Sequence, residues 1–349
     1  MHVEEFSGNR TAWTDYLKAN GGGVLASWEW GDFKKGHGWK VRRLQVRDGE
    51  DVRLVTSVLQ KPLPAGFCFF YCPLSPVVKG GDWHDPKNQA AFEALADYLK
   101  ADAKPERALF LKVDPHVAEA DFPLDWLTNL GFKDSVEDVQ APFVVHVDLR
   151  PTTEEIFAAM KQKGRYNIRS AQKKGVEVKA GSTEADLDIF YKLHQATAAR
   201  QGITYRAKDY FSEMRQRLMV DAGHATFLTG WHEGEPVASI IVTFLGEESI
   251  YLYGGNSLDD RTTNASYLVQ WEGIQLAKQR GCTFYNMTGV APTDDPDDAW
   301  AGLRQFKLKF GGEIVALLGA RDQVYKPLRY TAFTQADRVR RKLAKRSGL

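Results

Sequence analysis

The chain is poor in cysteine, and the few cysteines present are not placed to form disulfides. Only three occur among 349 residues. Cys68 and Cys72 stand in one apolar stretch, where a strand would hold their Cα atoms about 13 Å apart, too far for a disulfide. Cys282 stands alone in the sequence. This usage predicts a protein of a reducing compartment without a disulfide framework.

Long apolar runs and targeting signals are missing as well. No stretch approaches the roughly 18 apolar residues of a membrane span, and residues 1–5 lack the cationic start and apolar core of a secretory signal. The eight histidines are scattered, and no cysteine–histidine cluster has zinc-like spacing. We therefore expect a cytoplasmic protein without a metal.

An excess of either charge is also absent. Lys plus Arg total 46 and Asp plus Glu 45, which gives a net charge of +1. This balance excludes a uniformly basic nucleic-acid binder, but it hides segregation along the chain. Cations gather at residues 161–179 and 338–346, while acids gather at residues 294–298. Local basic tracks for an anionic partner therefore remain compatible with the composition.

Length and hydrophobic periodicity predict two domains of the α/β class. At about 150 residues per domain, the chain is long enough for two, and apolar periods of strand and helix type alternate throughout. We expect a first domain at residues 1–150, closed by a strand at 143–148 and joined by the C-terminal segment 318–349, which packs back on it. We expect a second domain at residues 151–317.

The most informative segment is the basic run at residues 161–179, which carries seven cations and one acid. On a helix, Arg165, Arg169 and Lys173 would share one face, because they recur every four residues, and such a face suits phosphates. The alternative is an ordinary solvated helix face. The cations of this run taken as candidate phosphate contacts are Lys163, Arg165, Arg169 and Lys173.

A second basic segment, residues 338–346, follows several aromatic residues near the C-terminus. It has the composition to bind RNA or the anionic inner surface of a membrane. A solubilising chain end is the alternative.

Aromatic residues accompany cations at three further places. Residues 27–39 set three tryptophans around Lys34 and Lys35, so that a ring such as Trp39 could pack a sugar or base, although core packing is the alternative. Arg206 and Tyr210 are one helical turn apart. Strand alternation predicts that Tyr251 and Tyr253 point to the same side.

A lysine stands between apolar neighbours late in the chain, in Phe306-Lys307-Leu308. Composition alone predicts that the Lys307 ammonium extends to water. No phosphate-binding P-loop, nucleophile elbow or dinucleotide fingerprint is present in the sequence.

Together these segments resemble the FemABX family, non-ribosomal peptidyltransferases that use aminoacyl-tRNA to add amino acids to peptidoglycan precursors. The resemblance covers most of the chain. It is carried by five segments in order: residues 27–30 with the lysines that follow, 111–115, 163–176, 251–255 and 306–312.

The resemblance implies a fold and a set of ligand contacts. The implied fold is two tandem GNAT-like domains with mixed sheets, and no sequence for the inserted coiled-coil arm of some members is present. The residues implied to bind the phosphates and sugar of the precursor are Lys34, or Lys35 instead, with Arg206, Tyr210 and one of Tyr251 and Tyr253; Trp39 and Phe306 complete the substrate-binding candidates. Lys307 is similar to a residue that handles the aminoacyl-tRNA end and stabilises transfer.

Two departures from the family pattern concern binding surfaces. Residues 73–76 read Pro-Leu-Ser-Pro in place of the family's Pro-Arg-Gly-Pro turn, so an arginine contact is missing there. Without the coiled-coil arm, tRNA contacts would fall to the 161–179 run or to the C-terminal segment.

The expected function is transfer of an amino acid from charged tRNA to the stem-peptide amine of UDP-MurNAc-pentapeptide or lipid II. Lys307 would stabilise the developing oxyanion. The candidates for the base are Asp114 and the two tyrosines, and a hydroxyl or phosphate of the tRNA is the alternative. We expect a monomer without a cofactor, with aminoacyl-tRNA as co-substrate and peripheral contact with the inner membrane surface. The alternatives are an acetyl-CoA-type N-acyltransferase, a FemAB-like enzyme with another acceptor, and a non-enzymatic RNA-binding or scaffold protein.

Overall fold

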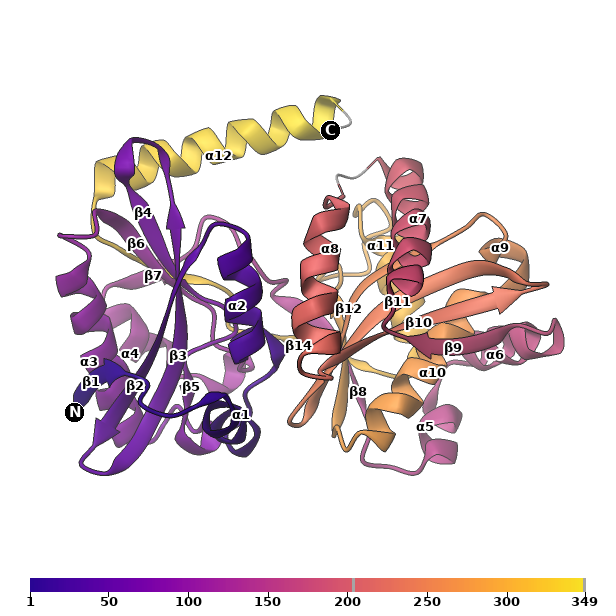
Figure 1. Cartoon of the computed structure of the whole chain (residues 1–349), viewed down its shortest axis with the longest axis horizontal. Coiled ribbons are helices and arrows are strands. Elements are labelled where there is room, and N and C mark those ends of the chain that lie inside the picture. The colour runs from indigo at the N-terminus through magenta and orange to yellow at the C-terminus, as the bar shows by residue number, and fades with distance from the viewer. Residues whose placement is uncertain (203–204, 348–349) are drawn as a thin grey trace. The chain divides into compact units, whose positions relative to one another are not determined.

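The computed structural model describes residues 1–202 and 205–347, with residues 340–347 described by their backbone alone. Most side chains of the predicted basic segment 338–346 therefore lie outside the described residues. The chain divides into two compact units, the first formed by Met1–Pro142 with Ala316–Arg341 and the second by Phe143–Val315 with Lys342–Leu349. Figure 1 shows both units and labels most of their helices and strands.

The first unit is built on a mixed sheet in the order β1-β2-β3-β4-β6-β15-β7, with β5 paired to β3. Most neighbours are antiparallel, but β4 and β6 run parallel. The strands are β1 (His2–Glu5), β2 (Lys40–Asp48), β3 (Asp51–Pro62), β4 (Cys68–Cys72), β5 (Val77–Val78), β6 (Ala108–Val113), β7 (Phe132–Asp134) and β15 (Arg321–Val324). The helices are α1 (Arg10–Ala19), α2 (Trp28–Gly36), α3 (Pro86–Asp102) and α4 (Leu124–Asn129), and α12 (Pro327–Ser347) belongs to this unit as far as Arg341.

Helices cover both faces of this first sheet. Leu44 and Val46 of β2 pack with Phe92 and Leu95 of α3 in one core. On the other face of β2, the guanidinium of Arg43 donates to the Trp28 carbonyl of α2 at 2.8 Å. Alternation along β2 thus sends successive side chains to opposite helices.

The second unit repeats this plan with a mixed sheet in the order β14-β8-β13-β12-β11-β10-β9. Here β12 and β13 are the parallel pair. The strands are β8 (Phe143–Asp148), β9 (Glu177–Gly181), β10 (Ala225–His232), β11 (Glu235–Leu245), β12 (Glu248–Asn256), β13 (Phe284–Gly289) and β14 (Glu313–Ala316). The helices are α5 (Thr153–Ala159), α6 (Gln162–Lys173), α7 (Glu184–Gln201), α8 (Lys208–Met214), α9 (Asp260–Thr263), α10 (Ala265–Gln279) and α11 (Ala301–Lys307), followed by the 3-10 turn η6 (Leu308–Phe310).

The two faces of the second sheet carry different helices. Ile240 and Val242 of β11 share a core with residues of α6 and α10. On the other face, the ring of Phe190 in α7 lies 5.3 Å from that of Phe227, whose partner across the ladder is Ile241. The α10 face and the α7 face of this sheet are therefore distinct, and the site residues divide between them.

The domain boundary differs from the one predicted at residue 150. Strand β8 pairs antiparallel with β13, so it belongs to the second sheet and does not close the first. The boundary consequently falls at Pro142. The chain then returns to the first unit at Ala316, where β15 pairs with both β6 and β7.

Candidate functional site

Lys307 is a buried amine at the end of α11. Only 2 % of the residue is exposed, and its Nζ donates to Thr288 Oγ1 at 3.1 Å and to the Gly289 carbonyl at 2.8 Å. Among the described side chains, no carboxylate forms an ion pair with it. Burial lowers the pKa of this amine to about 7. The composition-based prediction that Lys307 extends to water is therefore wrong.

The acceptors of Lys307 are held at the end of β13 by a polar chain. Thr288 has a φ of 62°, a conformation that is unfavourable for a β-branched residue. Its N–H donates to the Asn286 side chain at 2.8 Å, and the Asn286 amide donates to Glu248 at 2.8 Å. These bonds hold Thr288 where its hydroxyl can meet the buried amine. No sequence signal singled out this support.

Tyr251 lies beside Lys307 on the α10 face of the sheet. The lysine Nζ is 5.7 Å from the centre of the tyrosine ring, and burial raises the pKa of the Tyr251 phenol to about 12. A Cβ on Gly254 would lie 2.3 Å from the Tyr251 hydroxyl, so only glycine leaves room for this ring. Phe306 packs nearby against Tyr267, with ring centres 5.0 Å apart.

Tyr253 points to the opposite face, because β12 contains a bulge. Val242 pairs with Tyr251, but Ile241 pairs with Tyr253, which leaves Leu252 as an extra residue. Residues directly opposite in a ladder share a face, so Tyr251 follows Val242 and Tyr253 follows Ile241. The predicted same-side placement of the two tyrosines is therefore wrong.

On the α7 face, Tyr253 joins two other predicted residues. Its hydroxyl lies 3.3 Å from that of Tyr210 in α8, and the exposed guanidinium of Arg206 sits 5.3 Å from the centre of the Tyr210 ring. Burial raises the pKa of Tyr210 well above its usual range. This cluster presents a cation and phenols of the kind that recognise phosphate and sugar groups.

In the first unit, the Lys34 ammonium lies on α2, 4.7 Å from the centre of the Trp30 ring. Lys35 is exposed. The half-buried Trp39 packs edge-on against Phe69, with ring centres 5.8 Å apart. Of the three tryptophans in this segment, Trp30 is the one buried in the core.

Asp114 is a buried carboxyl at the end of β6. It accepts a hydrogen bond from the Tyr71 hydroxyl at 3.2 Å, and burial raises the pKa of the carboxyl to about 7. The ring of Tyr71 also lies 6.5 Å from that of Trp39. Tyr71 thus brings two predicted site residues together, although its apolar strand gave no sign of this role.

The part of the basic run that carries the candidate phosphate contacts forms α6, and the end of the run lies in β9. The cations of α6 differ in surroundings. Arg165 turns back to donate to the carbonyls of Ala158 and Met160, the former at 2.8 Å. Lys174 donates to the Thr262 carbonyl. Lys163, Arg169 and Lys173 are exposed. The predicted face of Arg165, Arg169 and Lys173 therefore includes one arginine that is engaged in holding α5.

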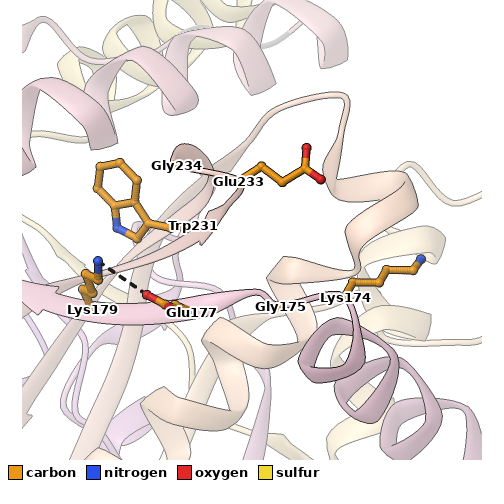
Figure 2. Close-up of a pocket in the computed structure, with 7 residues that line it drawn as sticks. All are labelled: Lys174, Gly175, Glu177, Lys179, Trp231, Glu233 and Gly234. Carbon is orange, nitrogen blue, oxygen red and sulfur yellow. Dashed lines mark ion pairs between the residues drawn. The ribbon is translucent and has the colours of Figure 1, made fainter.

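A cavity of about 530 Å³ lies beside the C-terminal end of α6, the edge strand β9 and its neighbour β10. Figure 2 shows the Trp231 ring beside the ion pair between Lys179 and Glu177, whose charged atoms are 3.5 Å apart. A second cavity, of about 330 Å³, lies between β8, α5 and Phe310. Neither cavity is lined by a predicted site residue. The residues lining the first are Lys174, Gly175, Glu177, Lys179, Trp231, Glu233 and Gly234.

Comparisons with known proteins place this geometry in a family. The model of the FemAB family matches residues 10–219 and 226–338. The chain belongs to the FemAB family. The fold is similar to that in "Crystal structure of FemX", with a TM-score of 0.86, 21 % identity, and coverage of 96 % of this chain and 100 % of that one.

A tandem GNAT protein from the clavulanic acid biosynthesis pathway is also similar, with a TM-score of 0.54, 10 % identity, and coverage of 93 % of this chain and 98 % of that one. The predicted fold class of two GNAT-like domains with mixed sheets is confirmed. Within the described part of the second unit, no long helical hairpin is inserted.

Curated relatives of this FemAB member are transferases. A lipid II:glycine glycyltransferase of Staphylococcus epidermidis (strain RP62A) is 26 % identical over 376 residues, covering 87 % of this chain and 88 % of the relative. One from Staphylococcus haemolyticus (strain JCSC1435) is 25 % identical over 395 residues, covering 92 % of each. The expected enzyme class, an aminoacyltransferase, is confirmed by these relatives. No described helix combines the length and apolarity needed to cross a membrane.

Proposed function

We propose that this FemAB protein transfers an amino acid from aminoacyl-tRNA to the stem-peptide amine of a peptidoglycan precursor, either lipid II or UDP-MurNAc-pentapeptide. The observation that carries the proposal is Lys307, a buried amine without a carboxylate partner among the described side chains, held by Thr288 and Gly289. The names of the relatives, lipid II:glycine glycyltransferases, support the choice of acceptor.

An aminoacyl ester is already activated, so the reaction needs no cofactor and no covalent enzyme intermediate. The acceptor amine attacks the ester carbonyl, the C–N bond forms, and the C–O bond to the tRNA ribose breaks. Negative charge gathers on the carbonyl oxygen, where the Lys307 ammonium stabilises it. Holding amine and ester in contact supplies much of the remaining rate.

The attacking amine must lose a proton, which ends on the ribose oxygen that leaves. Asp114 of the first unit is one proposed base, because a carboxyl with a pKa of about 7 can accept a proton at neutral pH; a hydroxyl or phosphate of the tRNA is the alternative. Burial, which removes the carboxylate from water, is the main cause of that pKa.

Candidate contacts for the acceptor are proposed within each unit separately. In the second unit, Arg206, Tyr210 and Tyr253 form the cluster that would bind phosphate and sugar. In the first unit, Lys34 or Lys35 would add a cation and Trp39 an aromatic surface. With lipid II as the acceptor, the protein would act as a cytoplasmic enzyme, a monomer at the inner face of the membrane.

The test is transfer by the purified protein, with several charged tRNAs and a pentapeptide precursor. A precursor heavier by one residue, lost after ribonuclease treatment, is the expected result. Lys307→Ala should remove the product. Lys309→Ala is the matched control, since Lys309 lies in the same segment and donates to the Tyr267 hydroxyl at 3.0 Å instead.

Absence of product with every charged tRNA would refute the proposal. Product that forms with acetyl-CoA and survives ribonuclease would instead identify an N-acyltransferase of the acetyl-CoA type. Transfer from tRNA to another amine would identify a FemAB-like enzyme with a different acceptor.

A further inference from the structure

Helix α6 carries an exposed aromatic residue among its cations. Tyr166 is 60 % exposed, whereas tyrosine side chains are usually intermediate in burial. Lys163, Tyr166, Arg169 and Lys173 follow one another at intervals of three or four residues, so they form one stripe along the helix. We call these four residues the α6 stripe.

The cations of the α6 stripe are not neutralised by acids. Among the described side chains, no carboxylate forms an ion pair with any of them. The Lys163 ammonium lies 4.8 Å from the centre of the Tyr166 ring, and the Arg169 guanidinium lies 5.3 Å from that of Phe157. Like charges at this spacing repel one another, so an anionic partner would stabilise the stripe.

The N-terminal end of α6 is fixed to the segment that carries Lys307. The N–H of Lys161 donates to the Lys309 carbonyl at 3.1 Å. A Cβ on Gly164 would lie 2.4 Å from that same carbonyl oxygen, so the helix backbone touches the segment directly. The α6 stripe therefore begins beside the Lys307 segment and runs away from it for about 15 Å, at 1.5 Å per residue.

We propose that the α6 stripe binds the unpaired 3′ end of an RNA, with Tyr166 stacked on a base and Lys163, Arg169 and Lys173 on phosphates. This inference rests on the proposed function, because it is the charged RNA that delivers its end to Lys307. A duplex hides the faces of its bases, whereas an unpaired end exposes them to an aromatic ring. Cations that follow the backbone beside a stacking ring are the usual means of binding single strands.

The experiment measures the affinity of the full chain for two uncharged RNA hairpins by fluorescence anisotropy. Both hairpins have the same stem, and one adds an unpaired 3′ tail of four nucleotides. The tailed hairpin should bind the unchanged protein more tightly. Tyr166→Ala should weaken binding of the tailed hairpin about tenfold and leave the blunt one unchanged.

Three further variants separate stacking from charge, and a urea midpoint separates both from folding. Tyr166→Phe keeps the ring and should keep the affinity. Lys163→Gln should weaken binding of both hairpins and reduce the salt dependence of the affinity by about one phosphate contact. Lys104 is an exposed cation of the first unit, and Lys104→Gln should change neither the affinity nor its salt dependence. The urea midpoint of Tyr166→Ala should match that of the unchanged protein, since the ring is exposed.

Equal affinity of Tyr166→Ala and the unchanged protein for the tailed hairpin would overturn the inference, even if transfer from tRNA is observed. Failure of the unchanged protein to prefer the tailed hairpin would overturn it too. Conversely, loss of tail-specific binding in Tyr166→Ala, with no transfer from any charged tRNA, would support the stripe and refute the proposed function.

Discussion

Lys307→Met is expected to make the protein more stable while it removes transfer. The buried lysine must keep its charge in an environment that lowers its pKa from 10.5 to about 7. Methionine has a similar length and no charge, so it fits a buried site without that electrostatic cost. The substitution would thus gain stability at the position that the proposed chemistry needs most.

The magnitude follows from the change in pKa. Each pKa unit corresponds to about 1.4 kcal/mol, so charging Lys307 in the folded state costs about 5 kcal/mol below pH 7. Methionine leaves Thr288 Oγ1 and the Gly289 carbonyl without their donor, a loss of about 1–3 kcal/mol for a buried group. Subtracting this loss from the cost of the buried charge, we expect Lys307→Met to raise the free energy of unfolding by about 2–4 kcal/mol at pH 6.

The pH dependence has a definite sign. Between pH 7 and 10.5 the unfolded chain holds a proton on this lysine that the folded chain has released, so the stability of the unchanged protein rises with pH. Below pH 7 both states are protonated and the full cost remains. The advantage of Lys307→Met should therefore shrink as the pH rises from 7 towards 10.

Urea unfolding at pH 6, 7, 8 and 9 measures these differences, with Lys309→Met as the control at a lysine that is only partly buried. The difference in free energy of unfolding between Lys309→Met and the unchanged protein should not change with pH. The reasoning about the buried ammonium is wrong if Lys307→Met is less stable than the unchanged protein at pH 6 and the difference in their free energies of unfolding is the same at every pH.

Three further predictions concern other positions. Between pH 4 and 7 the buried carboxyl of Asp114 holds a proton that the unfolded chain has lost, so the stability of the unchanged protein should fall as the pH rises. Asp114→Asn should remove this fall, and urea midpoints across the range would test it. Gly164→Ala should lower the free energy of unfolding by about 1–3 kcal/mol and reduce transfer, because its Cβ would meet the Lys309 carbonyl. Gly302→Ala has open space around its Cβ and should keep the stability and the transfer activity. A normal urea midpoint for Gly164→Ala would contradict this prediction. Arg165→Gln should lower stability by about 1 kcal/mol without weakening RNA binding, because its guanidinium holds the end of α5; an RNA affinity reduced as in Lys163→Gln would contradict it.

Local signals in the sequence predict the elements well. Thr183 stands just before an apolar period of helical type, a position typical of an N-cap, and it accepts a hydrogen bond from the N–H of Asp186 at the start of α7. Strand β6 coincides with the mostly apolar run at residues 108–113, which apolar periodicity indicates as a strand. Capping and periodicity are properties of neighbouring residues, so a sequence shows them directly.

Pairings between strands that are far apart in the sequence could not be predicted from local patterns. The pattern of residues 143–148 predicts a strand but does not identify its partner, which is β13 more than a hundred residues later. The return of β15 to the first sheet depends on similarly remote contacts, including the buried ion pair of Lys112 with Asp322 at 3.0 Å. Neither element carries a local mark of the sheet that it joins.

The bulge at Leu252 explains why strand alternation predicted the wrong arrangement of the two tyrosines. A regular β12 would have sent Tyr251 and Tyr253 to one face, whereas the extra residue sends them to opposite faces of the sheet. Tyr251 then lies against Lys307, which is proposed to act on the ester, and Tyr253 lies against Tyr210, which is proposed to bind the acceptor. One strand thereby connects the two proposed sites, so a shift of β12 would disturb both together.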